Sequence, residues 1–329
     1  MGIAIPFPDT QPPGYDWLAN ETVFDPAVHL QLEAPDHIIM LSDLGYDEAE
    51  IATKATPVAA STPFRVLSDE GTAVLLQTAR ELRQHVRPAG DRIENVLRGG
   101  CYRSRWLRDL CTSQEVSDHL EKIYGIAIAP HPMPLHLGHM NFEPTSIDTA
   151  IDKWHHDTLP LDFVLMVTNP ADVDGGRFEY FTGTKHEAAE LAAAGKTPPP
   201  ERTVAPDFPG AGYAIALHGN MVVHRAGPLL NLNERISMVN GYVALDTSLV
   251  DQSRFVDLIA VDDHDVIFTE WARMAAWRAQ SRLAALVTDL PFTNDKDLVI
   301  YELERAMEDA QRAVDEIRSG NQTVEHYGG

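Results

Sequence analysis

The sequence predicts a mainly β protein with flanking helices, and three observations carry that prediction. From residue 126 to 247 the chain is dominated by short runs of β-branched and aromatic residues, broken by glycine and proline. The apolar residues of 295–319 recur at helical spacing instead. Residues 1–64 are proline-rich and follow neither period. We therefore expect one compact domain, with a β core braced by the segments before and after it.

The N-terminal segment, residues 1–125, is expected to be irregular and helical. Ser68 caps a predicted helix that runs to about Val86, with apolar residues at helical spacing. A capping box from Thr112 to Glu115 predicts a second helix over the residues that follow. Both helices are expected to brace the core rather than to form a separate domain.

The core, residues 126–247, contains one predicted insertion near 184–210. The insertion begins with a short helix that ends at Gly195 and continues as a proline-rich stretch. On a rigid β scaffold such an insertion is either an active-site lid or a passive surface loop, and the sequence leaves both open.

The C-terminal extension, residues 248–329, is predicted to form two helices, over about 264–288 and 295–319. The second helix has a regular apolar stripe of Val299, Leu303, Ala306, Ala310, Val314 and Ile317. The stripe must be buried against the β core or against a second copy of the chain. Homodimerisation through these helices is therefore one of two expectations.

Composition narrows the partner class. The 329-residue chain has a formal net charge of −23, which argues against nucleic acid and anionic membranes as partners. No apolar stretch approaches the roughly 18 residues of a membrane span, and the N-terminus lacks the basic start and apolar core of a signal peptide. Two cysteines, Cys101 and Cys111, suit a reducing compartment. We expect a cytoplasmic protein that acts on a small molecule.

The run His155-His156-Asp157 carries the most chemical information. Residues i and i+2 of a strand project to the same side, so His155 and Asp157 should share a face while His156 points away. His224 closes a strand-like run that starts at Met221. Two imidazoles and one carboxylate on one face of an iron ion leave its other positions open. These residue types predict such a metal site.

Arg235-Ile236-Ser237 follows after a predicted chain break at 226–228 and is expected to begin a return strand. Arg235 and Ser237 would then share a face. A planar guanidinium beside a hydroxyl suits bidentate capture of a carboxylate.

Two other pairs with similar spacing are interpreted differently. His119 and Glu121 lie on the second predicted helix, where residues i and i+2 diverge and cannot share a metal. His136 and His139 would point to opposite faces of a strand, one buried and one exposed. Neither pair is expected to bind a metal.

The whole pattern resembles the Fe(II)/2-oxoglutarate-dependent dioxygenases, whose signature is H-x-D, a distal His and then R-x-S about ten residues later. The resemblance covers about residues 135–245 and is greatest for the small-molecule, phytanoyl-CoA-hydroxylase-like branch. It implies a double-stranded β-helix core, the jelly roll shared with cupins.

The resemblance also implies roles for single residues. His155, Asp157 and His224 would hold Fe(II), while Arg235 and Ser237 would hold the distal carboxylate of 2-oxoglutarate, with Asn141 as a further contact. O2 would be the second co-substrate, and succinate and CO2 would be released. Because an aspartate would occupy the third ligand position on the iron, no coordination position is left for a halide ion, which favours hydroxylation over halogenation. Desaturation, epimerisation and cyclisation stay open.

The substrate is less well specified. Arg103 and Arg105 would share a face in an extended segment and could bind an anionic group, or they could form ordinary surface ion pairs. Trp154 would line the pocket or belong to the core. An amino acid or a natural-product intermediate is the preferred substrate class. The alternatives are a hydroxylase of protein side chains and a cupin-like metal-binding or sensing protein.

Overall fold

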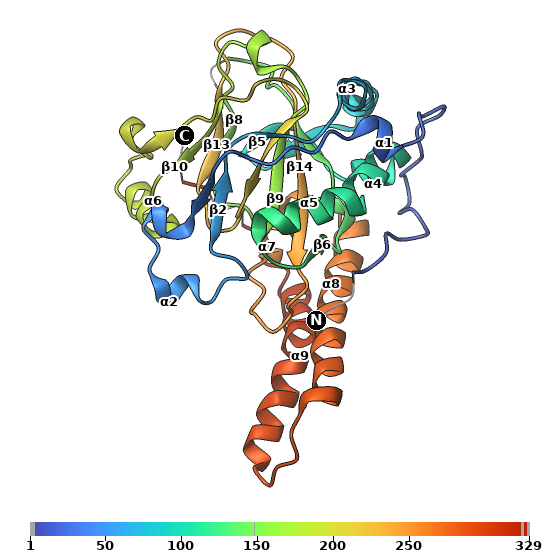
Figure 1. The fold of residues 1–329 in the computed structure, drawn as a ribbon, viewed down its shortest axis with the longest axis vertical. Helices are drawn as coiled ribbons and strands as arrows, with labels where there is room; N and C mark the ends of the chain where they lie inside the picture. Colours follow the sequence, from blue (N-terminus) through green and yellow to red (C-terminus); the bar gives the residue numbers. More distant parts are fainter. Residues whose placement is uncertain (1–3, 148, 324–325, 328–329) are drawn as a thin grey trace.

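Two antiparallel sheets form the centre of the computed structural model, which describes residues 4–147, 149–323 and 326–327 (Figure 1). The larger sheet has the strand order β1 (Ile38–Met40), β2 (Val58–Ser61), β12 (Tyr213–Leu217), β9 (Leu161–Met166), β14 (Ser237–Ala244), β7 (His139–Asn141), β5 (Ile93–Leu97) and β4 (Arg87–Ala89). Two further strands pair with it, β3 (Phe64–Arg65) with β12 and β6 (Ile128–Pro130) with β14. The smaller sheet has the order β11 (Thr203–Val204), β10 (Phe178–Phe181), β13 (His224–Pro228) and β8 (Ala150–His155).

Strand β9 shows how the larger sheet divides the core. Its side chains alternate between the two faces, as a strand requires. Phe163 and Leu165 join an apolar cluster that also contains residues of the N-terminal helices. Val164 and Met166 join another cluster, which includes Phe178 of the smaller sheet. The larger sheet is therefore buried on both faces, by helices on one side and by the smaller sheet on the other.

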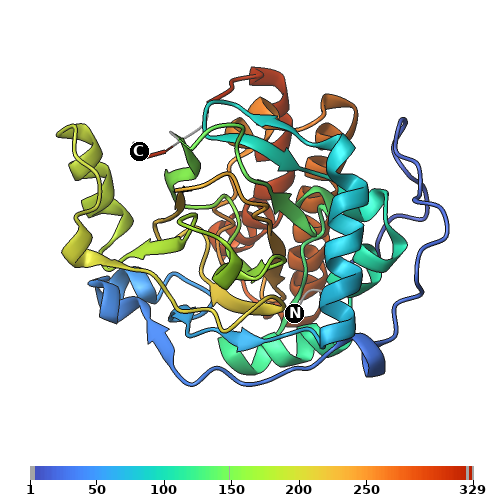
Figure 2. The same cartoon turned by 90° about the horizontal axis from the view of Figure 1, so that it is seen from above.

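Three helices supply the first of these layers: α3 (Asp69–Leu82), α4 (Arg105–Cys111) and α5 (Gln114–Tyr124). Seen from above, α3 lies on the opposite side of the molecule from α6 (Lys185–Ala193), the helix of the insertion (Figure 2). Ser68 caps α3 as predicted, because its side chain accepts a hydrogen bond from the amide of Gly71. The cap of α5 is Ser113 rather than Thr112, since the Ser113 hydroxyl accepts from the Val116 amide.

The N-terminal segment departs from its prediction. It was expected to be irregular and helical, yet it provides β1 to β5 of the larger sheet. These strands have two to five residues each, too few to show an alternating pattern. Short helices and turns connect the elements: α1 (Pro26–His29), α2 (Glu48–Ile51), η1 (Leu41–Leu44), η2 (Arg83–His85), η3 (Gly100–Tyr102), η4 (Pro134–His136), η5 (Pro170–Asp172) and η6 (Pro200–Arg202).

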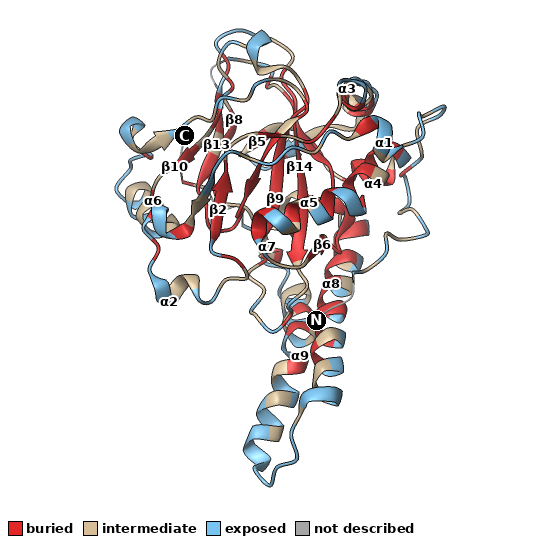
Figure 3. Cartoon of the chain, viewed as in Figure 1, coloured by how far each residue is buried: buried red, intermediate tan, exposed pale blue. Residues whose placement is uncertain are grey.

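The C-terminal helices follow the predicted bounds closely. After α7 (Phe255–Val261), α8 (His264–Asp289) and α9 (Lys296–Ser319) form a hairpin that projects from the body (Figure 1). The first half of α8 is buried against the body, but the distal part of the hairpin is exposed (Figure 3). Within one chain the α9 stripe is not wholly buried, because Leu303 is 44% and Val314 41% exposed, so the expected burial against the β core is incomplete.

No helix in the described ranges is long and apolar enough to cross a membrane. The two cysteines are free thiols, and both are buried.

Glu270 ties α8 to the body. Its carboxyl oxygens accept hydrogen bonds from the Tyr102 hydroxyl at 2.8 Å and the Leu135 amide at 3.0 Å. Burial raises the pKa of Glu270 to about 8, whereas an unfolded glutamate titrates near 4.3. Between these values the native state holds a proton that the unfolded state has lost, so stability falls as the pH rises through this window.

We expect the free energy of unfolding to fall by up to about 1.4 kcal/mol per pH unit between pH 5 and pH 8 from this group. In Glu270→Gln the amide oxygen can accept from the Leu135 amide and the NH2 group can donate to the Tyr102 hydroxyl, without a titrating proton, so this substitution should remove that part of the slope. Denaturant unfolding of both proteins across the range measures the difference. Equal slopes in the two proteins would contradict the assignment.

Candidate metal centre and the cavities beside it

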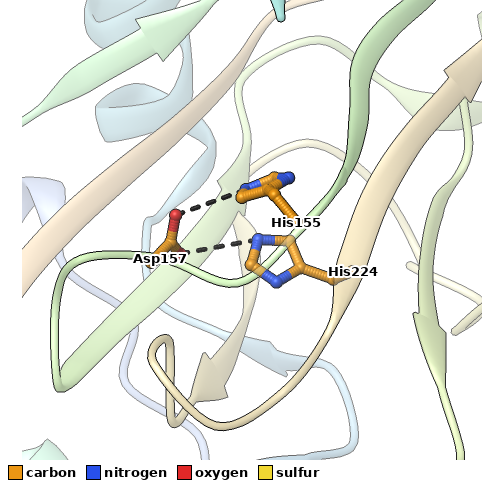
Figure 4. A group of neighbouring side chains, drawn as sticks. All are labelled: His155, Asp157 and His224. Atoms are coloured by element: carbon orange, nitrogen blue, oxygen red, sulfur yellow. Dashed lines mark ion pairs between the residues drawn. The ribbon is translucent and has the colours of Figure 1, made fainter. Parts of the chain in front are cut away.

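Pairing of β8 with β13 brings the two predicted histidines together. His155, the last residue of β8, lies directly opposite His224, the first residue of β13. The His155 Nε2 atom is 3.3 Å from one Asp157 oxygen, and His224 Nε2 is 3.5 Å from the other (Figure 4). Three ligand atoms, one from each residue, lie within 4.8 Å of one another. The structure thus brings together the three residues that the H-x-D pattern and the distal histidine predicted.

Backbone carbonyls orient both imidazoles. His155 Nδ1 lies 2.6 Å from the Lys153 carbonyl and His224 Nδ1 lies 3.0 Å from the Val222 carbonyl, so each Nδ1–H donates to a backbone oxygen. The lone pair is then on Nε2, which faces Asp157, and this is the arrangement that metal-binding histidines show.

The charge states also suit a metal ion. Burial lowers the pKa of His224 to about 4, so its imidazole is neutral at pH 7. Burial alone would raise the pKa of Asp157, but His224 and His155 outweigh it and hold that pKa well below its ordinary value. The cluster therefore offers two imidazole nitrogens and an ionised carboxylate, the donor set of a non-haem iron site.

His156 points elsewhere, as its position between the two ligands predicted. Its Nδ1 atom lies 2.6 Å from the Tyr327 hydroxyl, and the two rings lie 5.6 Å apart. The H-x-D register is therefore the predicted one.

A β-bulge adds Asp152 to this neighbourhood, a residue that the sequence motif did not indicate. His224 pairs with His155, but Ala226 pairs with Asp152, so β8 has one extra residue between the two pairs. The bulge turns Asp152 to the side of His155, with its carboxylate 3.4 Å from His155 Nδ1. The same carboxylate is 2.8 Å from Arg92 Nε.

Asp162 was also missed, although a carboxylate within the apolar run of β9 was a visible signal. Its side chain is fully buried, and neither carboxyl oxygen has a hydrogen-bond partner within the described residues. Burial, with the nearby Asp157 charge, raises the pKa of Asp162 well above its ordinary value. The raised pKa favours the protonated form of Asp162, which adds no second negative charge beside Asp157.

Arg235 and Ser237 lie together, as predicted, although β14 begins only at Ser237. The guanidinium donates to the Ser237 hydroxyl at 2.7 Å and to the Gly176 carbonyl at 3.1 Å. Gly176 has φ +60° and a side chain there would collide with Leu229, so only glycine fits this approach. No acidic side chain of the described part of the chain forms an ion pair with Arg235, and burial lowers its pKa to about 10.

Arg235 lines a cavity of about 340 Å³. Met166, Phe178 and Arg235 are among its lining residues, and the Phe178 ring lies 5.4 Å from the His224 ring. This volume is within the range of small-ligand sites.

A second cavity, of about 70 Å³, lies beside Asp157. Both His136 and His139 line it, and both are buried. The prediction of one buried and one exposed imidazole was wrong, because η4 turns the chain at His136 and β7 begins only at His139. His139 Nδ1 has no hydrogen-bond partner within the described ranges, and burial lowers the pKa of His139 to about 3.

The three residues suggested for substrate binding lie elsewhere. The segment is not extended: Arg103 ends η3 and Arg105 begins α4. Their guanidinium groups stack over Tyr15 at 4.2 Å and Trp17 at 4.6 Å. Trp154 is 1% exposed and packs in an apolar cluster. The expected shared face of Arg103 and Arg105 does not form, and Trp154 has the core position that was its alternative.

One strand boundary was also misplaced. His224 begins β13 rather than closing a strand, and the predicted break at 226–228 lies inside β13. The residues before it form a turn, in which the Met221 and Val222 amides both donate to the His218 carbonyl. Their apolar side chains pack in the core. In the sequence, a run of buried apolar residues in a turn therefore has the same pattern as a buried strand.

No protein-family model matches this chain, and no curated protein is detectably similar to it in sequence. Several solved structures resemble it. The non-heme alpha-ketoglutarate-dependent epimerase SnoN from nogalamycin biosynthesis is 18% identical over 62% of this chain and 83% of its own, with a TM-score of 0.42. EctD from S. alaskensis, solved with 2-oxoglutarate and 5-hydroxyectoine, is 16% identical over 54% and 69%, with a TM-score of 0.38. AviO1 from Streptomyces viridochromogenes Tue57 is 17% identical over 60% and 95%, with a TM-score of 0.41. Similarity this distant identifies neither a reaction nor a substrate.

Loss of any triad side chain should weaken divalent metal binding by at least about 100-fold, the upper end of what outer-sphere changes cause. Anaerobic calorimetric titration with Fe(II) measures this for His155→Ala, Asp157→Ala and His224→Ala. His156→Ala is the matched control and should bind normally. If His156→Ala lost the metal while His155→Ala kept it, the assigned register would be wrong by one residue.

Proposed function

We propose that this chain is an Fe(II)- and 2-oxoglutarate-dependent oxygenase that hydroxylates a C–H bond of a small molecule. One observation carries the proposal: a buried arginine without an ion-pair partner lines a cavity, and Phe178 in the wall of that cavity contacts His224 of a two-histidine, one-carboxylate cluster. The cluster suits non-haem iron, and the arginine suits an anion that the protein itself does not supply.

In this proposal His155, Asp157 and His224 hold the iron. Arg235 and Ser237 hold the distal carboxylate of 2-oxoglutarate. Asn141 pairs with Ser237 across β7 and β14 and is a further contact. When bound, iron, 2-oxoglutarate and O2 together supply the oxidising power that breaks a C–H bond, with succinate and CO2 as by-products.

The surrounding residues exclude water from the proposed metal site and limit its negative charge. His155 is 1% and His224 5% exposed, and the raised pKa of Asp162 favours its neutral form beside Asp157. We assign the two sheets as the halves of a double-stranded β-helix within one compact domain. The triad would then lie between the sheets, where water is excluded.

The cavity beside Asp157 is our candidate substrate site. Its two guanidinium groups are already neutralised, Arg92 by Asp152 and Arg98 by Asp262 at 2.7–2.8 Å. Burial lowers the pKa of His136 and His139 in its wall, and Asp257 is paired with Arg254 at 2.9 Å. The rest of the wall includes apolar side chains of β5 and α7. These features favour a compact substrate without net charge, such as an amino acid or a natural-product intermediate, over a protein side chain. A volume of about 70 Å³ holds only one or two waters, so α7 or the β4–β5 hairpin must move to admit it.

The insertion covers the other cavity. Pro206, Asp207 and Phe208 line it, and Asp207 forms a 2.7 Å ion pair with Arg177 on the opposite rim. We assign 184–210 as a lid over the 2-oxoglutarate site rather than a passive loop.

Arg235→Ala should raise the dissociation constant of 2-oxoglutarate by about 30-fold or more, because a buried charge-assisted pair contributes 2 kcal/mol or more. Its affinity for Fe(II) should not change. Arg105→Ala is the control, since this arginine stacks over Trp17 and does not line the cavity. Calorimetric titration of the anaerobic Fe(II) protein measures both constants. Metal binding without any 2-oxoglutarate binding would favour the cupin-like sensor instead.

Compounds that accelerate O2 consumption by the protein with Fe(II) and 2-oxoglutarate identify substrates. For such a compound, His139→Leu should raise KM by about 10-fold, the effect of one lost hydrogen bond. The KM for 2-oxoglutarate should stay constant and is the internal control. An unchanged substrate KM would remove His139 from the proposed substrate site.

A further inference from the structure

Helix α9 has two apolar faces, and α8 covers only one of them. The covered face contains Ala306, Asp309 and Ala313, all buried, and Arg278 of α8 donates to Asp309 at 2.9 Å. The second face is a stripe with alternating three- and four-residue spacing: Ile300, Leu303, Met307, Ala310, Val314 and Ile317. This spacing, kept over three heptads, is the signature of a coiled-coil seam.

The part of α9 far from the body is mostly exposed (Figure 3), whereas Ile317, at the other end of the stripe, packs partly against the body. Ile300 and Met307 are each 50% exposed, Leu303 is 44% and Val314 is 41%. At 3.6 residues per turn its centre lies about 110° around α9 from the face that packs on α8. A small shift of α8 within the same hairpin therefore cannot cover the second stripe of α9.

We propose that the occupant of this stripe is a second copy of the chain, whose α9 packs antiparallel against the first. In antiparallel register the stripe is complementary to itself. Ile300 faces the partner's Ile317, Leu303 faces the partner's Val314, and Met307 faces the partner's Ala310. Each layer occurs twice about a two-fold axis, as an isologous interface requires.

Charges beside the stripe select this orientation. The flanking positions, seven residues apart, are Asp297, Glu304, Gln311 and Arg318. Antiparallel pairing places Asp297 next to the partner's Arg318, and both residues are exposed. A parallel pair would instead place the flanking positions against Val299, Ala306 and Ala313, without any ion pair. It would also bring both β bodies to the same end of the hairpin.

The size of the contact sets the strength of the dimer. Residues 297–318 span about 33 Å of helix, which is three heptads and close to the shortest coiled coil expected to be stable. The dimer should therefore dissociate on dilution rather than be permanent.

Sedimentation equilibrium of the full chain over a range of concentrations tests the proposal. The wild type should show a monomer–dimer equilibrium. Met307→Glu should raise the dimer dissociation constant by at least about 100-fold, because the two-fold axis places two glutamates in one apolar contact. Tyr301→Glu is the matched control: it changes a 57% exposed residue of the same helix, outside the stripe, and should leave the constant unchanged. A wild-type monomer at every concentration, or equal effects of the two substitutions, would overturn the proposal.

Cysteine pairing tests the orientation. Leu303→Cys/Val314→Cys should form disulfides between chains on mild oxidation, because these positions face each other across the axis. Leu303→Cys alone should form none, since its two copies would be about 16 Å apart along the helix axis. The native Cys101 and Cys111 are fully buried and do not interfere. A disulfide in the single variant would indicate a parallel pair and contradict the proposed register.

Discussion

The register of β8 against β13 is the constraint on which the candidate site depends. It places His155 opposite His224 at the end of both strands, and Asp157 follows two residues later. Apolar contacts on both faces hold that register: Ile151 packs with Ala226, and Trp154 packs in the same cluster as Val223. A slip by one residue would exchange the two faces, so the packing of the smaller sheet and the geometry of the triad are set together.

Arg235 differs from the other arginines of the site in its hydrogen-bond partners. Arg92 and Arg98 each have a carboxylate partner within hydrogen-bond distance. Arg235 has a hydroxyl and a backbone carbonyl instead, although the whole chain carries a net charge of −23. A buried guanidinium without a counterion is costly. An anionic ligand in the adjoining cavity would offset that cost, and this links the fold to a carboxylate-bearing co-substrate.

Local patterns in the sequence predicted the features that depend on near neighbours. The i, i+2 rule identified His155 and Asp157, and the bounds of α8 and α9 follow from helical periodicity and capping. Features that depend on distant pairing were not predictable. The bulge that turns Asp152 toward His155 exists only against β13. Strands β1 to β5 are too short to show a period, and the environment of His136 depends on a turn whose neighbours come from far along the chain.

The most direct test of the central claim is visible spectroscopy of the anaerobic protein, titrated first with Fe(II) and then with 2-oxoglutarate. The account predicts a charge-transfer absorption band that appears only when both are present, because 2-oxoglutarate would bind directly to the iron held by His155, Asp157 and His224. Tight metal binding with no band on addition of 2-oxoglutarate would contradict it. The cluster would then be a structural or sensory metal site.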